Sequence, residues 1–324
     1  LKEYKEKTSA TLVANPNFYL GEPKTKNLIF KVVATNAELQ AVETGDVDIH
    51  DQVVCDDDHI EEAMSAGFIN LKIQPTLGYG YVATNQKNEI FQDVKVRQAL
   101  LHAIDRKSLN QAVYGQYAIT LNIPQAPISW LYDDEGMETY DYDLEKAAEL
   151  LKEAGWEKDG DKLMKDGKQM KIVFSAMSGN VVTDTMIPLM IDAYGQLGID
   201  FQAEYVDWPT LQSKSQNGTF DMLFMAWGLT ADPDLTGTFA SAEAGGTQNR
   251  TGYANPELDK MLAEALASTS QDEQKEKYKE IYKLINEELP LYPIYERCDL
   301  ICYNTRVQNI EQSSYVCLLY TSPS

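Results

Sequence analysis

Strand-like and helix-like segments alternate along most of the sequence, and this alternation limits the fold more than any other feature. Residues 27–34 are an apolar run rich in β-branched side chains, which is typical of a strand, and 46–54 and 69–76 are predicted as two further strands. Between them, 35–45 and 56–67 carry helix-forming residues, with aspartates at the start of the second segment and a glycine at the end of each. The order β-α-β-α-β predicts an α/β layer.

The alternation continues beyond an extended, Gly- and Tyr-rich stretch at 77–86. Capping residues and apolar stripes at helical spacing predict helices over 93–115, 143–155, 183–197, 255–268 and 271–289. Apolar runs predict strands over 170–178, 199–207, 220–228 and 289–304. The last dozen residues, 313–324, show neither the helical nor the strand period of apolar residues. We therefore treat them as a tail that does not look native and leave them out of the fold prediction.

Composition disfavours several classes of function. Asp and Glu number 50 and Lys and Arg 28, and the resulting charge of −22 argues against nucleic acid and anionic membrane surfaces as partners. No apolar stretch approaches the roughly 20 residues that a membrane span needs. The first residues lack the apolar core of a signal peptide and do not begin with Met, so we expect the chain to be cut from a longer protein.

The motifs of common enzymes do not occur in the sequence. It contains no nucleophile elbow, phosphate-binding loop, dinucleotide motif or HExxH pair. His50, Cys55 and His59 flank three aspartates and by residue type suit a metal, but those aspartates equally suit the start of a helix. We predict no metal and no cofactor. His102 is predicted to be a partly buried structural histidine.

Two carboxylates, Asp232 and Asp234, follow the predicted strand 220–228 and allow two interpretations. On a loop at the end of a buried strand, where α/β folds bind ligands, a carboxylate can hold an amine or act as an acid or base. Alternatively, Asp232 caps a short helix that begins at Pro233. Three aromatic residues likewise either fill the core or line a pocket for an apolar or peptide-like ligand. Tyr79 and Tyr81 flank Gly80 in a segment that looks like a crossing between layers, and Trp227 follows an apolar strand at its carboxyl end.

The segment FQDVKVRQALLHAIDRKSL (91–109), with LGYGYVATN before it, resembles the solute-binding proteins of peptide and nickel ABC importers, known as family 5. Other segments that look like this family follow in its order, namely NPNFYLGEPKTKNLIFKVV, AVETGDVDI, YDLEKAAELLKEAGW, AWGLTADPD, NRTGYANPELDKML and LPLYPIYE. Each motif is modest alone, but their common order makes the resemblance specific. It covers about residues 10–306.

The resemblance implies an α/β, two-lobe, periplasmic-binding-protein-like clamshell (type II) whose first lobe is incomplete. Residues 1–76 are then the remaining part of lobe I, 77–296 the inserted ligand-binding lobe II, and 297–312 the return segment to lobe I, before the tail at 313–324. An incomplete lobe is expected to expose apolar surface.

The resemblance also implies a function without chemistry. The family's members bind peptides or similar small solutes between the lobes by hinge closure and deliver them to the permease subunits of an ABC importer. We therefore expect a monomer that lies outside the cytoplasm, in the periplasm or at the outer face of the cell membrane, with a lipid anchor in the full-length protein.

Several site residues follow from the family's motifs. Trp227 matches the family's pocket-lining Trp, and peptide-binding members often place an Asp three residues later to pair with the ligand's α-amine. Thr230 stands there in this chain, so either Asp232 substitutes or the solute lacks a free amine. Further matches lie near the first hinge and beside the cleft, namely Tyr79, Tyr81, Asn85, Asn249 and Tyr253.

Two other classes of function stay open. One is a carboxylate-based hydrolase that uses Asp232 and Asp234, and the other is a structural or adhesion module.

Overall fold

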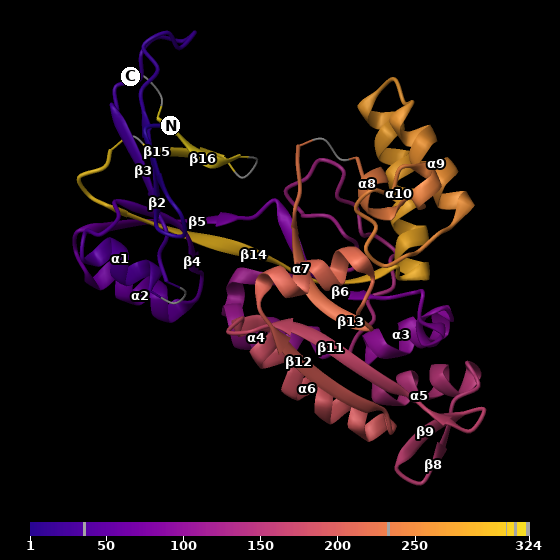
Figure 1. Cartoon of the computed structure of the whole chain (residues 1–324). Coiled ribbons are helices and arrows are strands. Elements are labelled where there is room, and N and C mark those ends of the chain that lie inside the picture. The colour runs from indigo at the N-terminus through magenta and orange to yellow at the C-terminus, as the bar shows by residue number, and fades with distance from the viewer. Residues whose placement is uncertain (35–36, 232–233, 309, 314–315, 322–324) are drawn as a thin grey trace. The chain divides into compact units, whose positions relative to one another are not determined.

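The chain divides into two units in the computed structural model (Figure 1), which describes residues 1–34, 37–231, 234–308, 310–313 and 316–321. The first unit is built mainly from Leu1–Gln74 and Asp299–Ser313, and the second mainly from Pro75–Cys298. Each unit is described separately below.

The first unit combines a small antiparallel sheet with two helices and three further strands. Strands β1 (Glu3–Lys5), β2 (Ser9–Val13) and β3 (Asn27–Lys31) form the three-stranded sheet. Then follow α1 (Glu38–Glu43), β4 (Ile49–Val54), α2 (Asp57–Ser65) and β5 (Ile69–Pro75). Both β4 and β5 pair with β14 (Leu291–Asn304), β4 with its residues Asp299–Tyr303.

The predicted β-α-β-α-β order of 27–76 is present, but the prediction of one common layer is wrong for its first strand. Strand β3 pairs with β2 and not with the sheet of β4, since strands that follow one another in the chain commonly pair. The strand lies exposed along its whole length, with Leu28 49%, Ile29 62% and Phe30 46% exposed. The first unit thus shows the expected exposed apolar surface.

A mixed sheet forms the centre of the second unit. Its order is β12 (Asp200–Val206), β11 (Lys171–Met177), β13 (Met222–Gly228), β6 (Gly78–Thr84) and the first part of β14, on which β7 (Ala118–Thr120) also pairs. Strand β11 runs parallel to β12 and β13, whereas β6 is antiparallel to both β13 and β14. A small hairpin sheet adds β8 (Glu157–Asp159), β9 (Lys162–Lys165) and β10 (Lys168–Gln169).

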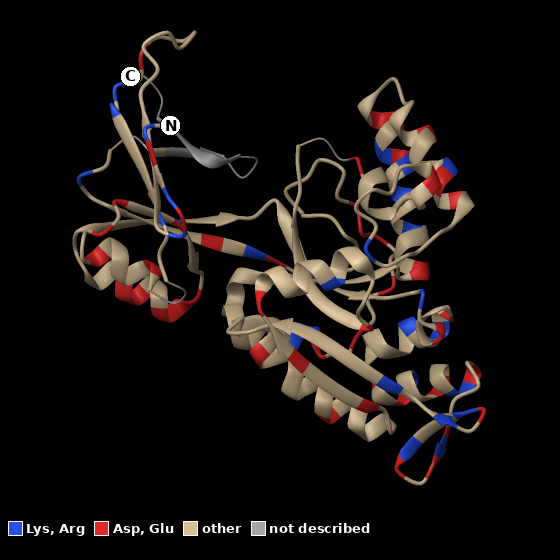
Figure 2. Ribbon diagram, in the orientation of Figure 1, with Lys and Arg blue, Asp and Glu red and all other residues tan. Residues whose placement is uncertain are grey.

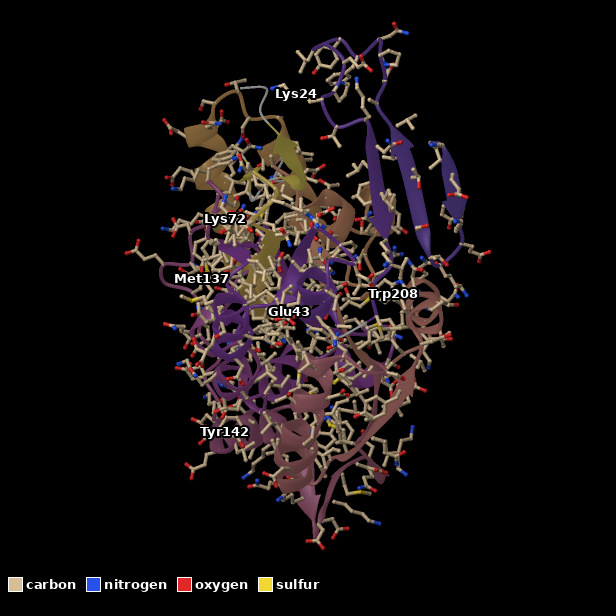
Figure 3. The ribbon with its side chains drawn as sticks, turned by 90° about the vertical axis from the view of Figure 1, so that its left-hand side faces the viewer. Lys24, Glu43, Lys72, Met137, Tyr142 and Trp208 are labelled. Atoms are coloured by element: carbon tan, nitrogen blue, oxygen red, sulfur yellow. The ribbon has the colours of Figure 1, made fainter. Side chains whose placement is uncertain are left out.

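Helices surround this sheet, and most of the predicted ones are confirmed. They are η1 (Glu89–Phe91), α3 (Val94–His102), α4 (Arg106–Tyr114), η2 (Gly115–Tyr117), α5 (Leu144–Glu153), α6 (Val181–Leu197), α7 (Trp208–Asn217), α8 (Thr236–Phe239), η3 (Ala242–Ala244), α9 (Pro256–Leu266) and α10 (Gln271–Glu288). Within the described ranges, none of the helices combines the length and apolar character that crossing a bilayer requires. Large apolar side chains are nevertheless exposed, such as Trp208 at 47% and Tyr142 at 44% (Figure 3).

Three details of the predicted elements need correction. The segment 93–115 is two helices, because Asp105 accepts the amide hydrogen of Ser108 at 3.0 Å and so caps a new helix, α4. The sequence reasoning missed α7 altogether. The tail contains β16 (Val316–Thr321), paired with β15 (Ile310–Ser313), although its sequence shows no strand period.

Two arginines are buried in the second unit and tie its segments together. The guanidinium of Arg106 donates to the carbonyl oxygens of Leu121, Pro293 and Thr139 at 2.5, 2.9 and 2.5 Å. Burial lowers its pKa to about 10. Arg97 donates in the same way to the carbonyl oxygens of Phe91 and Glu288. These donors thus satisfy carbonyl groups in loops, at the ends of helices and in β14.

Charge is distributed unevenly over the elements (Figure 2). Acidic residues alone occur among the charged residues of α1 and α2, whereas the hairpin of β8 and β9 carries lysines and acidic residues together. The overall charge of −22 is thus not carried by every surface.

Candidate aromatic solute site

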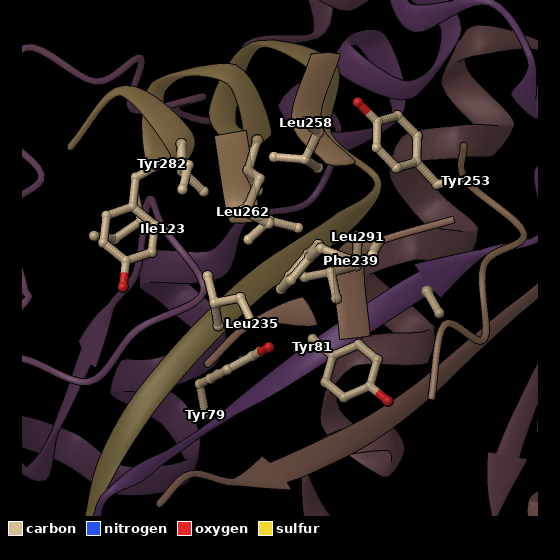
Figure 4. Packing of buried hydrophobic residues seen from close by; sticks show 14 of the residues in the cluster. Tyr79, Tyr81, Ile123, Leu235, Phe239, Tyr253, Leu258, Leu262, Tyr282 and Leu291 are labelled. Atoms are coloured by element: carbon tan, nitrogen blue, oxygen red, sulfur yellow. The ribbon is translucent and has the colours of Figure 1, made fainter. Parts of the chain in front are cut away.

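Strand β6 presents two different faces because glycine and tyrosine alternate in its sequence. Successive side chains of a strand point to opposite faces, so Tyr79, Tyr81 and Ala83 share one face and join the buried apolar cluster of the second unit (Figure 4). Gly80 lies on the other face, where the ring of Tyr295 packs against it. A Cβ atom at Gly80 would lie 2.6 Å from Cζ of that ring. The glycines therefore permit close packing on one face and leave the tyrosines to shape the other.

Trp227 reaches the same face of the sheet from the neighbouring strand. It lies near the end of β13, opposite Tyr79 in the antiparallel register. Its ring stacks on Tyr81 with the centroids 6.1 Å apart and an angle of 5° between the planes. The indole N–H is buried and has no acceptor among the residues that the structure describes. A buried donor without an acceptor costs about 1–3 kcal/mol, so a ligand oxygen there would be stabilised.

A small pocket opens beside this stack, within the second unit. Its walls include Tyr81, Trp227, Phe239, Gln248, Arg250, Thr251, Tyr253 and Leu291. The cavity volume is about 10 Å³. That is about the room that one water molecule needs, so the pocket suits a single functional group of a larger ligand.

Asn249 and Tyr253 form the framework of the segment that closes this pocket. The amide of Asn249 donates to the carbonyl oxygens of Ala240 and Tyr253 at 2.9 and 2.7 Å, and its oxygen accepts the hydroxyl of Thr251 and the amide hydrogen of Gly252. Tyr253 is only 5% exposed, and burial raises its pKa to about 12. Tyr253 lines the pocket, whereas the polar atoms of Asn249 are already used within the protein.

Asn85 is also a framework residue in this structure. Its buried amide group donates to the carbonyl oxygens of Gly218 and Phe220 at 3.0 and 2.8 Å, and its oxygen accepts the amide hydrogen of Lys87. It thus fixes the turn between α7 and β13. None of these bonds leaves its amide free for a solute.

The loop after Trp227 holds the remaining predicted residues. Thr230 is exposed, and Asp232 lies outside the described residues. The predicted helix start at Pro233 also lies outside the described residues. Asp234 accepts the amide hydrogen of Thr236 at 2.8 Å, at the start of α8. Asp234 thus stabilises the turn that leads into α8, whose N-cap residue is Leu235. Nothing in the described part of the loop supports the hydrolase alternative.

The histidines serve structural purposes. The carboxylate of Asp56 caps α2 by accepting the amide hydrogen of His59 at 2.8 Å and also contacts the imidazole Nδ1 at 2.7 Å. His102 lies against the carbonyl oxygen of Asp141 through Nδ1 at 2.8 Å and is 9% exposed, as predicted for a structural histidine. Over the part of the chain that is described, no three His, Cys, Asp or Glu side chains are grouped as a metal site.

The sequence reasoning thus named four aromatic residues that the structure brings into one cluster, namely Tyr79, Tyr81, Trp227 and Tyr253. It missed Arg250, Gln248 and Phe239, which line the same pocket. Arg250 lies inside the segment NRTGYANPELDKML that carried the resemblance. A cation next to aromatic residues in that segment was the available signal.

Comparison with known proteins gives consistent results. Residues 1–249 match the family described as bacterial extracellular solute-binding proteins, family 5, middle region. The oligopeptide-binding protein AppA of Bacillus subtilis is 32% identical over 302 residues, which is 91% of this chain and 55% of that protein. The nickel-binding periplasmic protein of Escherichia coli is 26% identical over 306 residues, covering 91% of this chain and 57% of that protein. The chain thus spans about half the length of the curated relatives it matches.

Solved structures show the same similarity. Bacillus subtilis AppA in complex with a nonapeptide matches 96% of this chain and 62% of its own chain, with a TM-score of 0.86 and 28% identity. NikZ from Campylobacter jejuni in complex with Ni(L-His) matches 98% of this chain and 64% of its own chain, with a TM-score of 0.84 and 23% identity, and shows the fold alone. The predicted α/β fold of periplasmic-binding-protein type is confirmed.

Proposed function

This chain belongs to the bacterial extracellular solute-binding proteins of family 5, and we propose from this premise that it binds peptides or a similar small solute for an ABC importer, without chemistry. Relatives with the names oligopeptide-binding and di/tripeptide-binding protein support the peptide, and relatives named for nickel and heme show that the family's solutes vary. The predicted closure of two lobes on the solute belongs to this proposal. A solute drives closure only as far as it prefers the closed state.

The stack of Trp227 on Tyr81 is the observation that carries the proposal. It offers a flat aromatic wall, a buried indole N–H without an acceptor among the described residues, and a pocket sized for one ligand group. Peptides provide a carbonyl oxygen at every residue, so many sequences can present an acceptor to such a wall.

The remaining expectations extend the same proposal. They are a location outside the cytoplasm with a lipid anchor, delivery to permease subunits, a monomeric state, and the assignment of 1–76 and 297–312 to lobe I and 77–296 to lobe II. The strongly negative charge supports the absence of nucleic acid among the partners.

Titration calorimetry with di- to pentapeptides tests the proposal. We expect at least one peptide to bind, and we expect Trp227→Ala to weaken that binding at least about tenfold, since the loss of an aromatic anchor typically costs 1–2 kcal/mol or more. Trp208→Ala is the matched control, because Trp208 is half exposed on α7 and does not line the pocket.

Equal losses in both variants, or no heat with any peptide, would contradict the proposal. Mass spectrometry of the peptides after incubation should show them unchanged, and cleavage would instead favour a hydrolase.

A further inference from the structure

Arg250 is a cation in the wall of the pocket, and the described residues supply no counterion for it. Its side chain is half-buried and lines the cavity beside Tyr81 and Trp227. Among the residues that the structure describes, none forms an ion pair or a hydrogen bond with its guanidinium. Arg97, Arg106 and Arg306 differ, because their guanidinium groups donate to backbone carbonyls or to a carboxylate.

The lack of a partner is informative in this chain. Acidic residues outnumber basic ones by 50 to 28, so the chain as a whole has more carboxylates than cations to pair with them. Partial burial removes water from a charge, and this costs free energy unless an opposite charge or an acceptor replaces the water. A half-buried arginine that none of the described residues pairs with is therefore suited to a partner from outside the protein.

The backbone that carries Arg250 is held firmly in place. On one side, Asn249 makes four hydrogen bonds with its side-chain amide. On the other, the carbonyl oxygen of Thr251 accepts the amide hydrogen of Gln86 at 2.8 Å, and Gly252 adopts φ +71°, a conformation that side chains rarely allow. The position of the Arg250 backbone is thus set before any ligand binds, which lowers the entropic cost of binding.

The side chain of Arg250 lines the same pocket as the aromatic stack, so its charge acts on the nearby tyrosine. Burial raises the pKa of the Tyr81 phenol, and the positive charge of Arg250 acts in the opposite direction. The indole N–H of Trp227, in the same wall, also lacks an acceptor among the described residues. The indole N–H is covered in this structure, whereas the side chain of Arg250 is only partly buried. Arg250 is therefore the group that a solute reaches more easily. Both groups require an acceptor, and a guanidinium fits a carboxylate through two parallel hydrogen bonds.

We propose that Arg250, in the wall of the pocket beside the stacked rings, binds a carboxylate of the bound solute at the mouth of that pocket and gives the site its preference for that group. This inference rests on the proposed function. In a peptide the carboxylate comes either from the C-terminus or from an acidic side chain, and the two sources share the same chemistry.

Four peptides separate the sources. They are tetra-alanine with a free C-terminus, its C-terminal amide, and two amides in which the second residue is Glu or Gln. Calorimetry gives the dissociation constant of each peptide for the unaltered chain, Arg250→Gln, Arg250→Lys and Arg306→Gln. The last variant is the matched control, since it removes the same charge at an exposed residue that pairs with Asp48 in the other unit.

We expect Arg250→Gln to weaken at least one carboxylate-bearing peptide about tenfold or more and to leave its uncharged counterpart nearly unchanged. If the variant loses affinity only for the peptide with the free C-terminus, Arg250 binds the terminal carboxylate. If it loses affinity only for the Glu peptide, Arg250 binds the side-chain carboxylate. Arg250→Lys should keep part of the affinity, Arg306→Gln should change none, and the carboxylate-specific part should decrease with added salt.

Two results would overturn the inference. If peptides bind but Arg250→Gln affects charged and uncharged peptides equally, or affects neither, Arg250 does not select a carboxylate, while the proposed function stands. If no peptide binds to the unaltered chain, the proposed function fails and the inference fails with it. Circular dichroism melting of each variant shows that a lost affinity is not a lost fold.

Discussion

Tyr253 illustrates how one residue joins framework and pocket. Its ring lines the cavity at 5% exposure, and its hydroxyl accepts a hydrogen from the amide of Asn255, the residue that caps α9. The phenol is thus both a wall for a solute and a link to the helix behind it. Burial makes its ionised form unfavourable, which is why its pKa is raised to about 12.

This raised pKa predicts a loss of stability in alkali. The folded-state pKa of Tyr253 lies above the ordinary value of 10.0, so its contribution is fully present below pH 10 and is lost as the pH rises through about 12. Between pH 9 and pH 12, the free energy of unfolding should therefore decrease in both chains. The decrease should be about 2 kcal/mol smaller for Tyr253→Phe than for the unaltered chain. Urea unfolding followed by circular dichroism at several pH values measures the difference.

Tyr205→Phe is the control for this prediction, because Tyr205 is 51% exposed on β12. That variant should follow the unaltered chain at every pH. If Tyr253→Phe also follows it, the phenol of Tyr253 ionises as easily in the folded chain as in the unfolded one.

Strand β6 shows how an element is specified by the alternation of small and large residues. Its seven residues are all buried, between β13 on one side and β14 on the other. Gly80 faces Tyr295, and a Cβ atom there would approach ring atoms to 2.6 and 2.7 Å. Because both residues are buried, the ring has little room to move aside.

Gly80→Ala should therefore destabilise the second unit by about 1–3 kcal/mol through overpacking. Gly195→Ala is the matched control on α6, where no atom lies within 4 Å of the added methyl group. There the same change should stabilise the chain by about 0.5–1 kcal/mol, since alanine favours a helix more than glycine does. Thermal and urea unfolding compare the two. Changes of the same sign would show that the ring of Tyr295 does not limit the space at Gly80.

Local signals account for what the sequence predicts well at this scale. Asp93, Asp143, Asn180 and Asn255 cap helices α3, α5, α6 and α9, and the apolar stripe of α10 is buried at Tyr278, Ile281, Tyr282 and Ile285. Strands β4, β5, β11, β12 and β13 follow from their apolar runs. These features depend on neighbours in the sequence, so the sequence displays them.

Features that depend on distant residues were not predictable in the same way. The pairing of β3 with β2, and the burial of Arg97 and Arg106, depend on partners that periodicity does not reveal. The same holds for the site. Tyr79 and Tyr81 were indicated by their place beside Gly80, and Trp227 by its place at the end of a strand. Only the three-dimensional arrangement adds Arg250 from a segment far along the chain.

Over the whole molecule, burial differs strongly between the two units. The structure describes every residue of β1, β2 and β3, and none of these residues is buried. The buried residues of the first unit lie on α1, α2, β4, β5 and β14 and on the residues that connect them. The second unit instead surrounds its sheet with helices and contains the large apolar cluster. Since apolar burial is the main favourable term in folding, the two units should differ in local stability.

Hydrogen exchange followed by mass spectrometry tests this difference within one molecule. We expect the amides of β2 and β3 to exchange at least about a hundredfold faster than those of β6 and β13, because their hydrogen bonds lie at an exposed sheet that opens without disrupting a core. The internal reference is β4, which belongs to the first unit but carries the buried Val53 and pairs with β14, and it should exchange at an intermediate rate. Equal protection of β3 and β6 would mean that β3 is covered in solution, for example by a second copy of the chain. Repeating the exchange at a tenfold lower concentration distinguishes that case, because a cover that comes from another molecule is lost on dilution whereas stability within the unit is not.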